Sequence, residues 1–271
     1  MFDNTGTFTR YYFITISGKA GVGKNYIADK LKQTLDNSDL DATTVDIVAY
    51  ADALRRELTL LEHEVREHNL SFIAAEHELP LSVMEEFTKI IGDKEIDFSN
   101  HKDPRYRHVL QWFGTDVMRS KDPDYWVKEL CKYVVYNLNG GYNYNAESTD
   151  TKYATRIIII PDARFSNEIL ALEHYMEWYV GFSGVFEGVL AYSLEDSVDH
   201  IKAKEAKRGS TPLTKEEQKH ASETSLDNFT GFNKVFYRDE SKNDGDRVVQ
   251  AIKSDLYNLM FNDKFVAINE N

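Results

Sequence analysis

The sequence predicts an α/β fold in which helices cover a mostly parallel central sheet. Strand-like apolar segments alternate with amphipathic helix-like segments over most of the 271 residues, as is typical of βαβ units. Residues 157–160 are a continuous run of four isoleucines. A β-branched run of this kind indicates an inner strand that is buried on both faces.

The expected elements follow from apolar periodicity and from turn residues. We expect strands at residues 13–16, 44–50, 156–162, 185–192 and 234–237, and helices at residues 26–35, 106–113, 126–138, 167–176, 246–260 and from residue 51 onward. Gly114 should break the helix that precedes it. Residues 62–105 lack a clean period and are expected to be helical insertions and loops, and residues 139–154 a surface loop.

Length and composition limit the organisation of the chain. The length suits one elaborated domain or two small ones. We expect a single domain over residues 11–262, between a flexible tail at residues 1–10 and a C-terminal tail at residues 263–271. A hydrophobic fraction of 42% argues against wholesale disorder.

Charge and cysteine content exclude several classes of function. The formal net charge of −13 argues against non-specific binding to nucleic acid or to an anionic membrane. Cys131 is the single cysteine, so neither an internal disulfide nor a multi-cysteine zinc site can form. The sequence has no apolar run of membrane-spanning length and no signal-peptide core, so we expect a cytoplasmic protein.

A glycine-rich turn between the first strand and the first helix carries the strongest functional signal. Its frame is Gly18-Lys19-Ala-Gly21-Val22-Gly23-Lys24. The glycines allow the backbone to turn tightly and aim its N–H groups inward, the helix N-terminus adds positive potential, and Lys24 adds a mobile charge. The pattern predicts a cradle for nucleotide phosphates, and the alternative is an ordinary strand–turn–helix.

The last position of this pattern departs from expectation. A hydroxyl residue there ordinarily binds the Mg²⁺ that accompanies the nucleotide, but this chain has Asn25 followed by Tyr26. Asn25 offers an amide oxygen, and the bulky Tyr26 is expected to narrow the cradle.

Other candidate residues follow the predicted strands, where parallel sheets bind ligands. Asp52 follows the second strand, and Asp162 and Arg164 follow the isoleucine strand. Asp162 is suited to a Mg²⁺-bound water or a sugar hydroxyl, or alternatively caps the next helix. Arg164 is suited to a phosphate or carboxylate, or alternatively forms an ion pair with Glu168.

Two further segments have both a ligand-binding and a structural interpretation. Between Arg107 and Arg119, Gln111 can read a base edge while aromatic residues, including Trp126 further on, either stack on a base or fill the core. A basic run within residues 198–222 forms either a mobile lid or a solvated helix face. The run consists of Lys202, Lys204, Lys207 and Arg208. His220 and Glu223 either belong to a helix cap or organise the hinge of that lid.

The order of these motifs resembles the bacteriophage deoxynucleoside monophosphate kinases, a family of P-loop kinases. The resemblance spans roughly residues 12 to 260, and its motifs are weak individually. They are Gly18–Lys24, Leu110–Arg119, Asp124–Val127, Asp162–Glu168 and His220–Thr224. The resemblance implies a three-layer P-loop kinase-type fold with helical insertions and a lid. It implies transfer of the ATP γ-phosphoryl group to a deoxynucleoside monophosphate with Mg²⁺.

The resemblance also implies roles for single residues. Residues 18 to 26 would bind the ATP phosphates, and Lys24, Arg107, Asp162 and Arg164 would act in catalysis, with Asp162 toward the metal. The acceptor nucleotide would be bound by Leu54, Arg55, Arg107, Gln111, Gly114, Thr115, Trp126, Asp162, Arg164 and Glu168. Residues 62–105 would lie near the acceptor site, and family precedent favours a homodimer.

Three hypotheses of function follow. The first is a deoxynucleoside monophosphate kinase whose partners are small-molecule nucleotides. The second is a P-loop kinase that acts on a modified pyrimidine nucleotide or on a base in DNA. The third is a nucleotide-binding protein whose metal chemistry is impaired by Asn25 and Tyr26.

Overall fold

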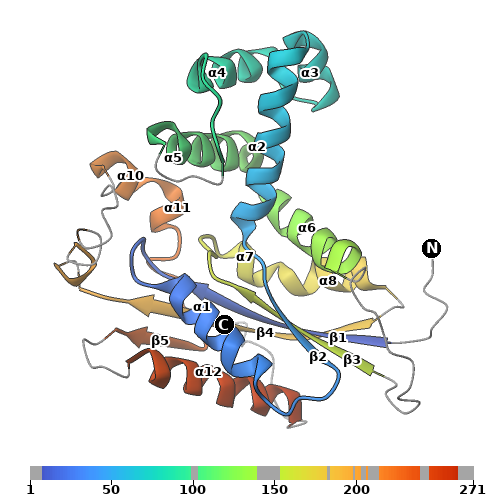
Figure 1. Ribbon diagram of the computed structural model, residues 1–271, viewed down its shortest axis with the longest axis vertical. Helices are drawn as coiled ribbons and strands as arrows, with labels where there is room; N and C mark the ends of the chain where they lie inside the picture. Colours follow the sequence, from blue (N-terminus) through green and yellow to red (C-terminus); the bar gives the residue numbers. More distant parts are fainter. Residues whose placement is uncertain are drawn as a thin grey trace. The chain divides into compact units, whose positions relative to one another are not determined.

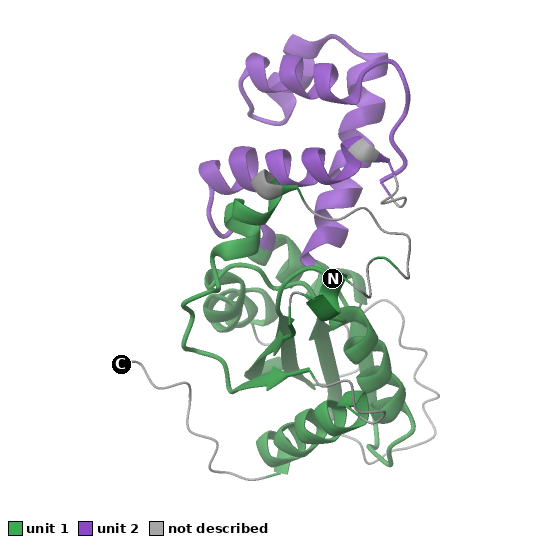
Figure 2. Ribbon diagram, turned by 90° about the vertical axis from the view of Figure 1, so that its left-hand side faces the viewer, with its two compact units in different colours: residues 1–49, 127–271 green, residues 50–126 purple. Residues whose placement is uncertain are grey.

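The computed structural model describes residues 8–98, 103–138, 153–181, 184–197, 199–202, 206, 214–238 and 244–261. The chain divides into two compact units, which Figure 2 colours separately. The first unit comprises residues 1–49 and 127–271, and the second comprises residues 50–126. None of the helices in the described part of the chain is both long and apolar enough to span a bilayer.

The first unit is built on a five-stranded sheet in the order β2-β3-β1-β4-β5 (Figure 1). The strands are β1 (Phe8–Ser17), β2 (Thr43–Ile47), β3 (Tyr153–Ile160), β4 (Gly184–Glu195) and β5 (Lys234–Tyr237). All four pairings are parallel. The isoleucine run lies in β3 between β2 and β1 and is fully buried, which confirms the prediction of an inner strand.

Helices cover both faces of this sheet. On one face, α1 (Lys24–Asp36) and α12 (Asp244–Phe261) bury their apolar sides against Tyr12, Ile14 and Ile16 of β1. On the other face lie α7 (Asn167–Leu170) and α8 (Leu172–Val180), and α8 packs against β4 (Figures 1 and 2). Side chains on successive strand positions alternate between these two helical layers. The result is the predicted three-layer α/β fold with a parallel central sheet.

The second unit is helical. It contains α2 (Tyr50–Glu67), α3 (Leu70–Glu76), α4 (Leu81–Ile91), α5 (Pro104–Gln111) and the π-helix η1 (Trp112–Arg119), and α6 (Tyr125–Lys132) begins at its end. Glu62 is buried in α2, where its Oε1 accepts hydrogen bonds from the backbone N–H of Ile96 (2.9 Å) and from Arg66 (2.9 Å). The predicted insertions at residues 62–105 are therefore largely ordered helices.

The prediction that Gly114 ends a helix is wrong. The helix continues through it as η1, and a Cβ at Gly114 would lie 2.8 Å from Cδ2 of Leu54. The glycine therefore permits close packing of η1 on α2, and sequence alone does not distinguish that use from a helix break.

Other element boundaries differ from those predicted. β1 begins at Phe8, inside the predicted N-terminal tail. The expected helix at residues 126–138 begins at Tyr125 and ends as the π-helix η2 (Tyr133–Asn137). The expected helix at residues 167–176 is the pair α7 and α8. Most of the predicted loop at residues 139–154, and the C-terminal tail, lie outside the described residues.

Candidate functional site

The glycine-rich turn has the backbone conformation that its sequence predicts. Gly18, Gly21 and Gly23 have φ angles of 134°, 80° and 101°, which side chains disfavour. A Cβ at Gly18 would lie 2.3 Å from the backbone oxygen of Leu194 in β4. Gly23 occupies the N-cap position of α1. The turn therefore packs directly on the neighbouring strand and leads straight into the helix.

Lys24 folds back into this turn. Its Nζ donates to the carbonyl oxygens of Gly18 (2.6 Å) and Lys19 (3.0 Å). The pKa of Lys24 is lowered from 10.5 to about 8, mainly by burial and next by the positive charge of Arg164, whereas Glu223 and Asp162 act in the opposite direction. Burial disfavours the charged form of this ammonium. An anion bound beside it would favour the charged form and would itself be stabilised by that charge.

Tyr26 packs against the first turn of α12. A Cβ at Gly245 would lie 2.7 Å from its ring, and the Nζ of Lys30 lies over the same ring and pairs with Asp246 (2.7 Å). These contacts give the tyrosine a packing role at the interface of α1 and α12. Asn25 is exposed beside it.

Glu168 holds the turn after β3 through backbone hydrogen bonds and does not form the ion pair with Arg164 that we considered as an alternative. Glu168 is buried, and its Oε2 accepts from the backbone N–H groups of Arg164 (2.6 Å) and Phe165 (3.1 Å). The Arg164 guanidinium instead forms an ion pair with Glu223 and donates to the carbonyl of Ser222 (3.3 Å). The alternative of an Arg164–Glu168 ion pair is not realised, because backbone N–H groups occupy that carboxylate and Arg164 binds the carboxylate of Glu223.

Asp162 does not cap the following helix, whose N-cap residue is Ser166 without a side-chain cap. It is half-buried and close enough to Lys24 to affect the pKa of that ammonium. His220, in contrast, does take the structural role that we considered. It is the N-cap of α11 (Ala221–Thr224), and its Nδ1 accepts from the backbone N–H of Ser222 (3.2 Å).

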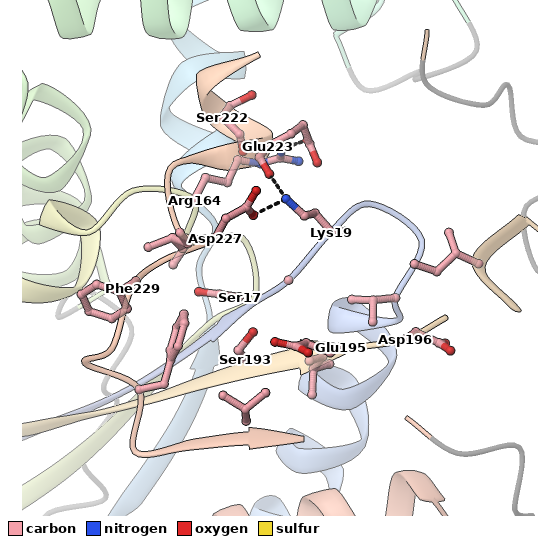
Figure 3. Close-up of a pocket in the computed structure, with 18 residues that line it drawn as sticks. Ser17, Lys19, Arg164, Ser193, Glu195, Asp196, Ser222, Glu223, Asp227 and Phe229 are labelled. Carbon is pink, nitrogen blue, oxygen red and sulfur yellow. Dashed lines mark hydrogen bonds and ion pairs between the residues drawn. The ribbon is translucent and has the colours of Figure 1, made fainter. Parts of the chain in front are cut away.

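A cavity of about 410 Å³ lies in the first unit, beside the glycine turn (Figure 3). Ser17 and Ser193 line it from β1 and β4, and Lys19 and Arg164 line it at the loops. Residues of the segment 222–232 line it from the other side. Ser17 is fully buried, and no described residue accepts or donates a hydrogen bond at its Oγ.

Three contacts at this site were not predicted from the sequence. Arg238, directly after β5, pairs with Asp244 and donates to the carbonyl of Val22 (3.2 Å). This hydrogen bond connects the glycine turn to the end of β5. Lys19 pairs with Asp227. Glu223 binds Arg164, as described above. The Arg238–Val22, Lys19–Asp227 and Arg164–Glu223 contacts each join residues far apart in the chain, and no local motif marks any of them.

The second unit brings together part of the predicted acceptor-binding set. Leu54 packs on Gly114, and Trp126 donates from Nε1 to the Gly114 carbonyl (2.8 Å). Arg55 pairs with Asp52 and donates to the Tyr106 hydroxyl (2.9 Å). Trp126 is buried, which supports the core interpretation for this aromatic residue. Arg107, Gln111 and Thr115 are half-buried on α5 and η1.

Gly114 and Thr115 lie in a π-helix, and helices of this rare type are frequent at functional sites. Among the described residues, no group of three or more His, Cys, Asp and Glu side chains is arranged to hold a metal ion. The lid candidates Lys204, Lys207 and Arg208 lie outside the residues that the structure describes.

Comparison with known proteins leaves the family open. No protein-family model matches the chain, and no curated protein matches it either. The resemblance to the phage kinases therefore stays a prediction.

Three solved structures each align with 90% of this chain. A gluconokinase from Sinorhizobium meliloti 1021 is 9% identical, with 94% of that chain covered and a TM-score of 0.37. A sugar kinase from Janibacter sp. HTCC2649 is 13% identical, with 95% covered and a TM-score of 0.36. A shikimate kinase from Bacteroides thetaiotaomicron is 11% identical, with 98% covered and a TM-score of 0.32. At such scores these likenesses carry no argument about activity or substrate.

The close approach of Gly18 to β4 gives a prediction about stability. Gly18→Ala combines a disfavoured φ with a clash against a backbone oxygen, so we expect the free energy of unfolding to fall by about 2 to 4 kcal/mol. Gly181→Ala is the matched control, because Gly181 also has a positive φ (53°) but no atom within 4 Å of the added Cβ. That variant should lose only about 1 kcal/mol in urea unfolding. Equal losses in the two variants would contradict the close-approach account.

Proposed function

We propose that the protein is an ATP-dependent phosphotransferase whose acceptor is a deoxynucleoside monophosphate. The observation that carries the proposal is the partly buried Lys24, folded into a glycine turn between a parallel strand and a helix N-terminus. Phosphoryl transfer depends on positioning and positive charge more than on a covalent nucleophile. This site supplies both.

The turn is suited to the phosphates of the donor. Its backbone N–H groups and the N-terminus of α1 attract an anion, and Lys24 can move from the Gly18 and Lys19 carbonyls to a phosphate oxygen. Arg164 lies close enough to affect Lys24 electrostatically. We propose that it stabilises the charge on the transferring group.

Asp162 and Asn25 are suited to a magnesium ion whose other ligands come from the substrate phosphates and water. Mg²⁺ usually takes one or two carboxylates, with substrate phosphates and water completing its shell. Asp162 is a half-buried carboxylate near Lys24, and the exposed Asn25 offers an amide oxygen. When bound, the ion would neutralise charge on the phosphates.

The acceptor proposal rests on the motif resemblance. We propose that the acceptor is bound by residues of the second unit, namely Leu54, Arg55, Arg107, Gln111, Gly114, Thr115 and Trp126. The packing of Gly114 on Leu54 and the hydrogen bond from Trp126 to the Gly114 carbonyl fix the position of η1, and Arg107, Gln111 and Thr115 are half-buried on α5 and η1.

The experiment is an ADP-release assay with Mg·ATP and separate acceptors. These are dTMP, dGMP, dCMP, dAMP and 5-hydroxymethyl-dUMP. Lys24→Met should reduce kcat/KM at least about a hundredfold. Lys30→Met is the matched control, because Lys30 lies on the same helix but pairs with Asp246. We expect it to stay within about threefold of the unchanged chain.

Two results would contradict this proposal. If ATP binds but no acceptor is phosphorylated, the result would favour the third hypothesis, a nucleotide-binding protein without catalysis. In that case Asn25 would not replace the hydroxyl that ordinarily binds Mg²⁺ at this position. Equal activity of Lys24→Met and Lys30→Met would show that the glycine turn does not take part in catalysis.

The lowered pKa of Lys24 predicts the pH dependence. Above pH 8 the free enzyme increasingly holds a neutral Lys24, so kcat/KM for ATP should fall about tenfold per pH unit well above that value. Bound phosphates raise the pKa, so kcat should not show this fall. Lys24→Arg should shift the decline to higher pH, since arginine stays charged. A kcat/KM profile that is flat to pH 9.5 would contradict the prediction.

A further inference from the structure

Two cations beside the glycine turn are already occupied by carboxylates of the chain. Lys19 pairs with Asp227 and donates to the carbonyl of Glu223. Arg164 pairs with the Glu223 carboxylate and donates to the carbonyl of Ser222. Figure 3 shows the four side chains meeting at one end of the cavity. Both carboxylates come from a single short segment, residues 222–227.

Glu223 is the more constrained of the two acids. Its side chain is only 6% exposed, whereas that of Asp227 is 47% exposed. A buried carboxylate needs a charged partner, because removing that partner leaves an uncompensated charge. Arg164 supplies this charge from the turn after β3, and the ion pair therefore attaches the segment to that turn.

The same carboxylate acts on the lysine of the turn. Glu223 favours the charged form of Lys24, as an anion close to that ammonium must. A phosphate placed on the turn would lie in the field of Glu223 and would be repelled by it. Phosphate and Glu223 therefore compete for the same group of cations.

We propose that Glu223 and Asp227 are internal anions that hold residues 214–232 on the glycine turn until a polyphosphate takes over Arg164 and Lys19. The proposal rests on the proposed function, since the competing ligand is the phosphate chain of the nucleotide. Binding then requires two ion pairs to exchange partners. The affinity for phosphate is reduced by this competition, and the segment is released when the turn is occupied.

The test is calorimetric titration of the full chain with inorganic tripolyphosphate. Glu223→Gln and Asp227→Asn each remove one competing charge with little change in shape. Each should tighten binding at least about threefold. Asp36→Asn is the matched control, because Asp36 is 44% exposed and pairs with Lys32 on α1. It removes the same charge away from the turn and should change binding by less than about twofold.

A second measurement needs no ligand. Hydrogen exchange of the backbone amides at residues 221–227 should be faster in Glu223→Gln and in Asp227→Asn than in the unchanged chain or in Asp36→Asn. Addition of tripolyphosphate to the unchanged chain should also speed this exchange. Asp227 is half exposed, so its variant remains informative even if Glu223→Gln is unstable.

The outcomes separate the two proposals. If both variants bind tripolyphosphate as the unchanged chain does, or more weakly, the proposed exchange of ion-pair partners is wrong. If only Glu223→Gln binds it more weakly, Glu223 does not compete with phosphate and instead orients Arg164. Exchange at residues 221–227 that does not respond to the variants would also overturn it. Failure of the unchanged chain to bind tripolyphosphate would instead overturn the proposed function.

Discussion

The structure of the site depends on one interaction, the contact of the Lys24 ammonium with the carbonyls of its own turn. A positive charge that is partly withdrawn from water is costly unless it is surrounded by acceptors. Here the carbonyl oxygens of Gly18 and Lys19 provide them. This arrangement needs a backbone that bends sharply over β4, which only glycine at position 18 permits. Arg238 fixes the far side of the turn through the Val22 carbonyl.

The charges around the turn are balanced within the protein. Lys19 and Arg164 are paired with acids from the segment that follows β4, and Arg238 is paired with Asp244. A chain with a net charge of −13 can therefore still present a local cluster of cations. Local pairing, and not the net charge, decides which anion this surface can accept.

The sequence was sufficient to predict the parts of the fold that are encoded locally. The isoleucine run of β3 and the glycine frame after β1 each carry a physical requirement that residue type alone reveals. Gly114 was misread because a glycine that permits close packing looks the same in sequence as one that ends a helix. The ion pair of Glu168 with Arg164 stood as an alternative because spacing does not show that two backbone N–H groups bind the Glu168 carboxylate.

The unpredicted part of the candidate site consists of long-range pairs. Arg238 reaches Val22 across 216 positions, and Asp227 reaches Lys19 across 208. Pairs of this kind depend on strand order and on how the segment before β5 returns to the sheet. No short motif contains that information, so only the three-dimensional structure identifies Glu223 and Asp227 as partners of the turn.

The most direct test of this account is an NMR titration of the Lys24 ammonium in the ligand-free chain, repeated with tripolyphosphate. The account predicts a pKa near 8 without ligand and a clear increase when the phosphate chain is bound. A pKa near the ordinary lysine value of 10.5 in the free chain, unchanged by tripolyphosphate, would contradict it.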